Sequence, residues 1–303
     1  MLKWISVLWK FSRPHTIIGS VISISVLWLM ALKVIGYVNH LSLLLLTLLV
    51  GITCNVFIVG LNQIIDIELD KINKPNLPLA NESLTLRNAY RIIFISLAMT
   101  LLFSFLSSII LVGLIVIILC IGVAYSAPPI QLKKHHLPAA LAITTVRGLL
   151  VNLGMFLHFI YASGQLTLDQ IIVQGFHVIP SEIWMLTSFV VAFSIAIAWF
   201  KDLPDTEGDK KFKFRTLALA YSPKVALYGG IALVGGAYFT TIIWSLRLEN
   251  PMISTMHAMA LSAFLANVWF VDLNRPKTIT RFYMLFWVFF FLEYIFFGIN
   301  AVS

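Results

Sequence analysis

The sequence predicts an all-α fold, that of a polytopic membrane protein with nine transmembrane helices, from its composition and from its long apolar runs. Of the 303 residues, 60% are hydrophobic and only 11% are charged, a balance outside the range of soluble globular proteins. A helix needs about 20 apolar residues to cross the hydrocarbon layer of a bilayer. No stretch between the apolar runs is long enough for a soluble domain, so we expect one domain over residues 1–303.

Nine apolar runs have the length of a span. In chain order the predicted spans cover residues 15–33, 42–62, 89–106, 108–125, 138–161, 183–201, 223–245, 253–271 and 280–300. The run from Ile92 to Ala124 is too long for one span, and only the pair Ser107 and Ser108 marks a turn inside it. That pair therefore separates the third span from the fourth.

The positions of Lys and Arg predict the orientation, because cytoplasmic loops are enriched in them. Nearly all of these residues precede the first span or lie between even-numbered and odd-numbered spans. Only Lys33 and Arg247 lie in the opposite loops, and Arg147 lies inside the fifth span. We expect the amino terminus on the cytoplasmic side, or its organellar equivalent, and the carboxy terminus opposite.

Two acidic clusters occur where the second and the sixth spans end on that cytoplasmic side. The first carboxylate row is Asn62, Asp66 and Asp70 in NQIIDIELD, and the second carboxylate row is Asp202, Asp205 and Asp209 in KDLPDTEGD. Spacings of 3 and 4 residues keep each row on one helix face, although Pro204 is expected to kink or end the second helix. Carboxylates beside hydrocarbon are costly unless a cation or a water-filled site compensates them.

The two rows are typical of a magnesium and diphosphate site. Mg²⁺ binds oxygen ligands, usually one or two carboxylates together with substrate phosphate oxygens. We expect the two rows to hold Mg²⁺ and a diphosphate jointly. The alternative for the carboxylates is a solvated helix end with local lysine pairs, which suits Glu68 and Glu207.

Cationic side chains near the rows are candidates for binding the diphosphate. They are Lys133, Lys134, Lys201 and Lys210, with Lys71 and Arg215 beside them. Enrichment of cytoplasmic loops in lysine explains any one of these equally well. Arg147 differs, because a guanidinium inside a span normally pairs with a buried group or faces a cavity.

Other classes of function have little support. The formal charge of +8 does not form a basic stripe interleaved with aromatic residues, so a nucleic-acid partner is not indicated, and no protein partner is evident. Cys54 and Cys120 make no disulfide framework, and the histidines lack the spacing of a zinc or haem site. No nucleophile elbow, P-loop or dinucleotide fingerprint occurs.

Several motifs together resemble one known family. NQIIDIELDKINKPNLPLA, AYSAPPIQLKKHHLPAAL, VRGLLVNLGMFLHF and KDLPDTEGDKKFKFRTLAL are similar to segments of the UbiA-type intramembrane prenyltransferases, especially the homogentisate prenyltransferase branch of cyanobacteria and plastids. FSRPHTIIGS near the amino terminus and VDL, ITRFYMLFW and FLEY near the carboxy terminus extend the resemblance over nearly the whole chain.

The resemblance implies transfer of a phytyl or related prenyl group from its diphosphate to homogentisate, with loss of CO₂, in tocopherol synthesis. It implies a UbiA-type bundle in a thylakoid, plasma or plastid membrane, with the motifs on the cytoplasmic or stromal side. The first and second rows match the two metal and diphosphate motifs of the family, which makes their aspartates the expected catalytic residues. Tyr125 and Lys133 match a Tyr and a Lys expected near the diphosphate.

Three residues are candidates for binding the acceptor. Arg13 suits its carboxylate, His15 its hydroxyls, and Asn55 lies on the same helix face as the first row. The alternative for the Arg13 segment is an interfacial anchor that begins a helix at Pro14. For Asn55 it is a hydrogen bond between helices.

Three other functions remain open at this point. One is a homogentisate solanesyl- or geranylgeranyltransferase, and another is a prenyltransferase of the same type acting on a different acceptor such as a chlorophyllide. A lipid or solute transporter is the alternative outside enzymes. The sequence does not predict prenyl chain length, since that depends on which apolar side chains point inward.

Overall fold

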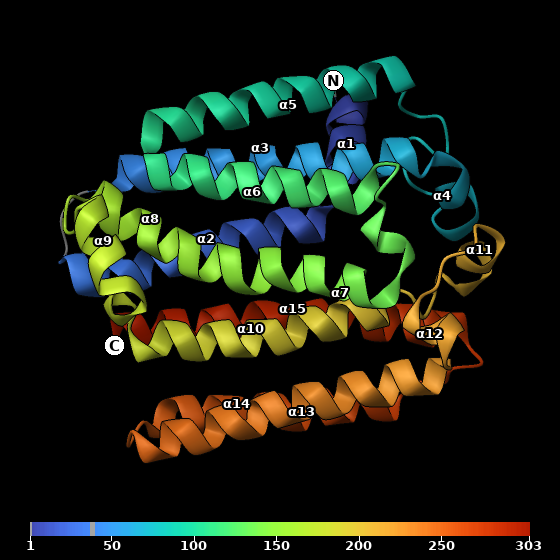
Figure 1. Cartoon of the computed structure of the whole chain (residues 1–303). Coiled ribbons are helices and arrows are strands. Elements are labelled where there is room, and N and C mark those ends of the chain that lie inside the picture. The colour runs from blue at the N-terminus through green and yellow to red at the C-terminus, as the bar shows by residue number, and fades with distance from the viewer. Residues whose placement is uncertain (1, 37–39) are drawn as a thin grey trace. The chain divides into compact units, whose positions relative to one another are not determined.

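The computed structural model describes residues 2–36 and 40–303, and it is built from helices (Figure 1). Within those residues, nine helices are long and apolar enough to cross a membrane, which confirms the predicted number and the all-α fold class. Eight of them are α2 (Pro14–Ile35), α3 (Leu41–Ile65), α5 (Leu86–Ser107), α6 (Ile109–Ser126), α10 (Ser181–Phe200), α13 (Pro223–Arg247), α14 (Pro251–Trp269) and α15 (Pro276–Val302).

The remaining span, His136–Ala162, is not a uniform α-helix. It consists of α7 (His136–Thr144), a π-helical segment η2 (Thr145–Gly154) and α8 (Met155–Ala162). Short helices complete the chain: α1 (Leu2–Phe11), α4 (Ile67–Asn73), η1 (Leu132–Lys134), α9 (Leu168–Gln174), η3 (Gly175–Val178), α11 (Thr206–Lys211) and α12 (Leu217–Ala220).

The chain divides into two compact units. Unit 1 comprises Met1–Lys133 and Gly154–Phe176, and unit 2 comprises Lys134–Leu153 and His177–Ser303. The first carboxylate row lies in unit 1 and the second in unit 2. One domain over residues 1–303 stays a prediction.

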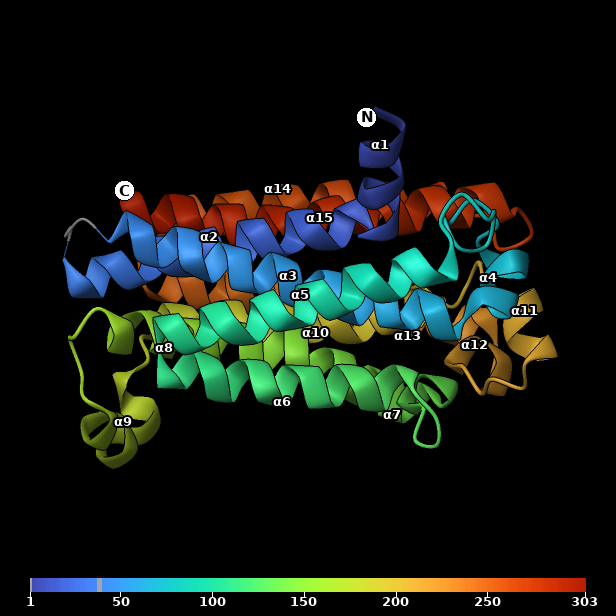
Figure 2. The same ribbon diagram turned by 90° about the horizontal axis from the view of Figure 1, so that it is seen from above.

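In unit 1, α3 is the central helix and packs along α2, α5 and α6 (Figures 1 and 2). Small and hydroxyl-bearing residues line these contacts, as is common where helices associate in lipid. The Thr100 hydroxyl of α5 donates to Thr53 Oγ1 of α3 across 2.8 Å. Gly122 of α6 packs against Ile58 of α3 so closely that an added Cβ would lie 2.9 Å from the Ile58 side chain.

The turn between α5 and α6 lies where the serine pair predicted it. Ser108 caps α6, because its Oγ accepts a hydrogen bond from the Leu111 backbone N–H. The buried His158 of α8 bonds Ser108 Oγ at 2.8 Å through Nδ1 and Thr47 Oγ1 at 2.9 Å through Nε2. Both ring nitrogens therefore have partners, and the turn is held against α3 and α8.

Unit 2 has an aromatic core around α10, the most buried of the spans. Phe193 of α10 stacks on Phe286 of α15 with ring centroids 4.7 Å apart, and Phe189 meets Tyr238 of α13 edge to face at 4.9 Å. A buried His257 of α14 contacts Glu293 of α15 at 2.9 Å inside this aromatic shell. The polar pair joins these two helices, and a second polar contact between them is the hydrogen bond that the Asn250 amide at the start of α14 donates to Asn300 of α15 at 2.7 Å.

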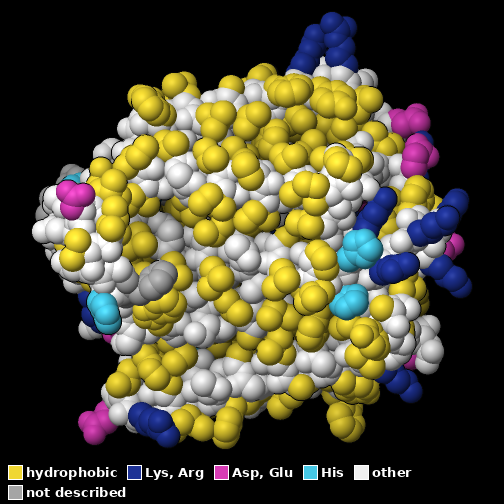
Figure 3. Space-filling view, in the orientation of Figure 1, with side chains coloured by type: hydrophobic (Ala, Val, Ile, Leu, Met, Phe, Trp, Pro, Cys, Tyr) yellow, Lys and Arg dark blue, Asp and Glu magenta, His cyan; other side chains and the backbone are white. Residues whose placement is uncertain are grey.

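The long helices present mostly hydrophobic side chains outward, while Lys, Arg, Asp and Glu side chains gather near helix ends (Figure 3). Phe105 of α5 is 76% exposed and Trp269 at the end of α14 is 87% exposed. A surface covered in this way by large apolar side chains is typical of helices that face lipid.

The axis of helix α1 makes a large angle with the axes of the long helices of unit 1 (Figure 2). One face of α1 presents the exposed side chains of Trp4, Ile5, Leu8 and Trp9, whereas Val7 and Phe11 are buried against the unit. An amphipathic helix with tryptophans on its outer face is typical of the membrane interface.

Candidate functional site in two carboxylate rows

The first carboxylate row spans the end of α3, with Asn62 in its last turn. Asp66 separates α3 from α4, so the row is not one straight helix as the spacing predicted. Helical hydrogen bonding nevertheless continues through the junction: the Asp66 N–H donates to the Asn62 carbonyl at 3.0 Å, and the Asp70 N–H donates to the Asp66 carbonyl at 2.7 Å. The three side chains thus stay in register although the helix bends.

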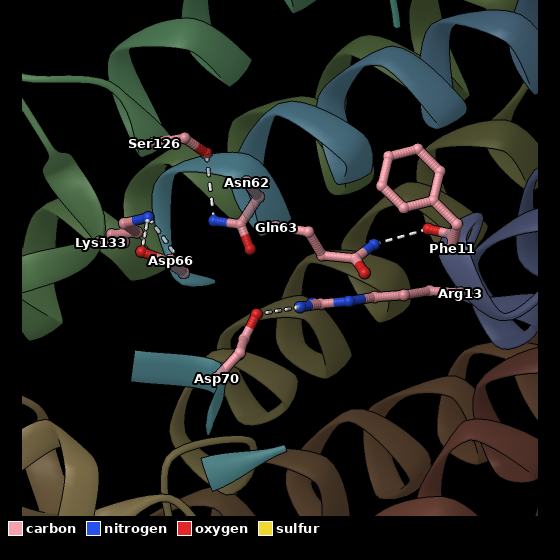
Figure 4. A network of polar contacts seen from close by, with 8 residues as sticks. All are labelled: Phe11, Arg13, Asn62, Gln63, Asp66, Asp70, Ser126 and Lys133. Carbon is pink, nitrogen blue, oxygen red and sulfur yellow. Dashed lines mark hydrogen bonds and ion pairs between the residues drawn. The ribbon is translucent and has the colours of Figure 1, made fainter. Parts of the chain in front are cut away.

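Lys133 of η1, from another part of unit 1, contacts Asp66 (Figure 4). Its Nζ donates to Oδ1 of Asp66 at 2.6 Å and to Oδ2 at 2.7 Å. The Lys133 side chain is 4% exposed and the Asp66 side chain 12%. Because both charges are withdrawn from water, the close contact compensates part of the cost of burying each of them.

Arg13, between α1 and α2, lies against the other carboxylate of this row (Figure 4). Its Nη2 is 4.0 Å from Oδ2 of the buried Asp70. The backbone of Arg13 has a φ of 52°, a left-handed conformation that residues other than glycine seldom adopt. Neighbouring contacts have to maintain that conformation and so the position of the guanidinium.

Gln63 supplies one of those contacts. Its side-chain amide donates to the carbonyl of Phe11 at 2.6 Å, two residues before Arg13 (Figure 4). Gly60, one turn earlier on α3, leaves room for the Phe11 ring, since an added Cβ would lie 2.8 Å from it. Helix α3 therefore contacts the end of α1, two residues before Arg13, and leads directly into the segment that carries the carboxylates.

Two further predicted residues of unit 1 bond to neighbouring helices. The Asn62 amide donates to Ser126 Oγ at 3.2 Å, and Tyr125 immediately precedes this serine in the last turn of α6. The Asn55 amide donates to Thr16 Oγ1 at 3.0 Å, which is the interhelical use that the sequence left open. His15 lies in the first turn of α2. Binding of the acceptor by Arg13, His15 and Asn55 stays a prediction.

The second carboxylate row lies where α10 ends, as Pro204 predicted. Helix α10 stops at Phe200, and α11 begins after Asp205. The aspartates are nevertheless buried, with exposures of 7% for Asp202, 8% for Asp205 and 4% for Asp209. Backbone bonds order them, because the Asp209 N–H donates to the Asp205 carbonyl at 3.1 Å.

The lysines near the second row differ in position. Lys201 contacts Oδ1 of Asp202 at 3.1 Å, whereas Lys210 is exposed on α11. The Lys134 carbonyl accepts the backbone N–H of Arg215 at 2.7 Å, which ties the segment before α7 to the segment after α11. Lys201 is therefore a cation in direct contact with a carboxylate of this row.

Arg147 lies in the π-helical segment η2, within a network that the sequence did not predict. Its guanidinium sits 4.7 Å from the ring centroid of Trp287 and 5.7 Å from that of Phe290, as cation–π contacts require. The buried Asn152 side chain donates to the Gly148 carbonyl at 2.7 Å and accepts the Tyr294 hydroxyl at 2.8 Å. Helix α15 thus supports the segment that carries Arg147.

The donor chemistry of the rows fits magnesium. Each row offers carboxylate oxygens, and the first adds the amide oxygen of Asn62, all of them hard ligands. Among the residues that the structure describes, no three His, Cys, Asp or Glu side chains converge closely enough to hold a metal alone. Mg²⁺ usually takes one or two carboxylates from a protein and completes its shell with water and phosphate oxygens, and carboxylates of this kind are present in both rows.

Lys71 and Glu68 form a local pair on α4, next to the first row. Lys71 Nζ is 2.7 Å from Glu68 Oε1, and the Glu68 side chain is 70% exposed. The hydrogen bond to Glu68 raises the pKa of Lys71. The two charges therefore form an ion pair at the surface, which is the local lysine pair that the sequence predicted for Glu68.

The nine apolar helices of the described residues, with buried carboxylates and an arginine among them, indicate an integral membrane protein with a polar site. The chain belongs to the UbiA prenyltransferase family, whose sequence pattern matches residues 22–290. The family resemblance and the enzyme class are thereby confirmed, and the transporter alternative is set aside.

Relatives with assigned activities match over most of the chain. The homogentisate phytyltransferase of Synechocystis sp. is 38% identical over 299 residues, which cover 96% of this chain and 94% of that protein. The chloroplastic homogentisate solanesyltransferase of Arabidopsis thaliana is 35% identical over 301 residues, which cover 95% of this chain and 75% of that protein.

Solved structures share the fold at low sequence identity. A UbiA homolog from Aeropyrum pernix K1 aligns with a TM-score of 0.69 at 18% identity, covering 94% of this chain and 98% of that one. A UbiA homolog from Archaeoglobus fulgidus, solved with DMAPP and Mg²⁺, aligns with a TM-score of 0.62 at 16% identity and the same coverage.

Proposed function

We propose that this protein transfers a prenyl group, most favourably phytyl, from its diphosphate to homogentisate in tocopherol synthesis. The observation that carries the proposal is the 38% identity to a homogentisate phytyltransferase over nearly the full length of both chains. The buried first row, which lies against two cations of its own unit, supplies the chemistry.

The reaction exchanges one bond for another. The bond between the allylic carbon and the diphosphate oxygen breaks, and a carbon–carbon bond forms to the acceptor ring. The ring carbon loses its proton, and the acetate side chain loses CO₂ and gains a proton. Leaving-group charge has to be neutralised as the first bond breaks, because negative charge builds on the diphosphate.

The residues of each row have distinct roles in this proposal. Asn62, Asp66 and Asp70, and in the second row Asp202, Asp205 and Asp209, would hold Mg²⁺. When bound, the ion neutralises charge on the departing diphosphate. Lys133, Lys134, Arg147, Lys201, Lys210 and Tyr125 are assigned to the diphosphate oxygens. Positioning and exclusion of water serve the attack by the electron-rich ring.

The length of the prenyl donor is the least constrained part of the proposal. Besides the solanesyltransferase, a homogentisate geranylgeranyltransferase of Hordeum vulgare is 30% identical over 310 residues. The phytyl donor is favoured because the Synechocystis relative has the higher identity and the fuller coverage of both chains.

The location proposed is a cyanobacterial thylakoid or plasma membrane, or a plastid membrane. Both carboxylate rows and the amino terminus are placed on the cytoplasmic or stromal side, since the lysines and arginines concentrate in the loops of that side.

The test uses purified protein, labelled homogentisate and separate phytyl, geranylgeranyl and solanesyl diphosphates. Product chromatography with phytyl diphosphate should show the greatest turnover, and excess chelator should abolish it. Asp66→Asn and Asp205→Asn should each lower turnover by about 100-fold or more, because each removes a charge that the leaving group depends on.

Matched controls come from the same segments. Glu68→Gln and Glu207→Gln also remove one carboxylate each, but from exposed positions. They should leave turnover within about twofold, because exposed charges contribute little. Full activity in Asp66→Asn, or activity unaffected by chelator, would refute the proposal.

A further inference from the structure

Lys133 occupies the position on Asp66 that a metal ion would take. Its Nζ lies 2.6 Å from one carboxylate oxygen and 2.7 Å from the other, so one cation engages both oxygens at once. A metal ion bound to this carboxylate needs at least one of the same oxygens. Lys133 and the metal therefore compete for Asp66.

Burial makes that competition strong. The Lys133 side chain is 4% exposed, and Asp66 has little access to water. Removing one partner of a buried ion pair leaves an uncompensated charge, which is costly. A metal ion that displaces Lys133 removes the two close contacts between the buried ammonium group and Asp66.

A diphosphate changes this balance, because it offers the displaced ammonium group new anionic oxygens. Lysine suits such an exchange, since its charge sits at the end of a flexible four-carbon stem. Arg13 stands at 4.0 Å from Asp70, a looser contact with the same row. Of these two cations, Lys133 makes the closer contact with a carboxylate of the first row.

We infer that Lys133 occupies the place of the metal ion at Asp66 until a diphosphate binds. The ammonium group of Lys133 then moves from Asp66 to the diphosphate oxygens. The inference rests on the proposed function, because it assumes a metal and diphosphate substrate at the first row. Its consequence is that metal and diphosphate bind cooperatively, each favouring the other. Free metal on its own binds weakly.

The test measures binding, not turnover. Purified protein in detergent is titrated with Mn²⁺, a spectroscopic substitute for Mg²⁺, and free Mn²⁺ is followed by electron paramagnetic resonance without any diphosphate. Lys133→Met should bind Mn²⁺ at least about tenfold more tightly than the unchanged protein, a factor within the usual range of coupling between sites. Equal or weaker binding would overturn the inference.

Two further variants separate competition from a general change of charge. Lys71→Met removes the same charge from α4, where Lys71 contacts Glu68 instead of Asp66, and should alter Mn²⁺ affinity by less than about twofold. Lys133→Arg keeps a cation and should stay near the unchanged protein. Tight Mn²⁺ binding in Lys71→Met as well would show a general electrostatic effect and refute the inference.

Thermal unfolding checks that the variant is folded. Lys133→Met should unfold at a lower temperature than the unchanged protein in chelator, and Mn²⁺ should raise its Tm by more than it raises that of the unchanged protein. A Tm that Mn²⁺ does not raise would contradict competition at Asp66.

Inorganic diphosphate tests the second half of the inference. After correction for the Mn²⁺–diphosphate complex in solution, diphosphate should tighten Mn²⁺ binding to the unchanged protein and do so much less in Lys133→Met. Product formation from homogentisate is measured separately on the unchanged protein. Cooperative binding without product would overturn the proposed acceptor, while product without cooperativity would overturn the role of Lys133.

Discussion

Gln63 shows how one buried side chain can control a site that it does not enter. Its amide bonds the Phe11 carbonyl at 2.6 Å, and Arg13 follows two residues later with a left-handed backbone. The conformation of Arg13 is stable only where its surroundings maintain it. We assign Gln63 a positioning role, through the end of α1, for the guanidinium beside Asp70.

Replacing Gln63 tests this role. Gln63→Leu leaves the Phe11 carbonyl without its donor and should lower the free energy of unfolding by about 1–2 kcal/mol. Turnover should fall by about tenfold, because Arg13 is no longer held in position. Thermal unfolding and product chromatography measure the two effects.

Gln165 offers a matched control at the other end of unit 1. Its side chain donates to the Ile35 carbonyl at 3.1 Å, also at the end of a helix. Gln165→Leu should cost some stability and leave turnover unchanged. If both variants lose turnover equally, Gln63 has only a structural role.

At the scale of single residues, the sequence predicts which charged residues belong to the candidate site better than it predicts which residues they contact. Aspartates at the ends of apolar helices are identifiable because their cost in a membrane is high. Gln63 and Ser126 have no such signal, since a glutamine or serine acquires its importance only from the group that the fold brings to it. The pairs Lys133 with Asp66 and Arg13 with Asp70 join segments distant in sequence, so spacing alone does not predict them.

At the scale of elements, breaks with a local cause were predicted and breaks without one were not. Pro204 marks the end of α10, and the pair Ser107 and Ser108 marks the turn before α6, through steric exclusion and capping respectively. The interruption between α3 and α4 at Asp66 has no proline or glycine next to it that could have predicted it. The π-helical η2 depends on partners in other helices, so periodicity gives no sign of it.

The π-helical segment carries the element-scale prediction. Tyr294→Phe removes the hydroxyl that donates to Asn152 and should destabilise the protein by about 1 kcal/mol, because the buried Asn152 oxygen loses its donor. The KM for prenyl diphosphate should rise, since the segment that carries Arg147 is less firmly held. Unfolding and steady-state kinetics measure both.

Tyr228 provides the comparison for that prediction. It lies on α13 with 62% of its surface exposed, so Tyr228→Phe should change neither stability nor KM. A Tyr294→Phe protein that matches Tyr228→Phe in both measurements would show that the hydrogen bond does not support the segment.

At the scale of the whole molecule, the sequence predicts how the chain is threaded through the membrane. Glu207 lies in α11, before the span formed by α13, and Glu249 lies just after that span. Both are exposed. A chain oriented by its lysines and arginines should present these two positions to different compartments.

Cysteine labelling tests the orientation. With Cys54 and Cys120 replaced by alanine, a protein carrying Glu249→Cys should react with an impermeant maleimide in intact bacterial cells. Glu207→Cys should react only after the cells are permeabilised. The protein without cysteines is the blank, and the reverse pattern would show that the orientation is wrong.

The apolar side chains that cover the long helices, such as the 76% exposed Phe105, also determine how an isoprenoid donor is supplied. The protein and the isoprenoid donor are both confined to the membrane, so they meet by diffusion in two dimensions. Its rate follows the number of donor molecules per unit of membrane area, and diluting the bilayer with inert lipid slows it. The proposed acceptor, homogentisate, is water-soluble, and its supply would follow its molar concentration in water. A single turnover would then depend on two different measures of concentration.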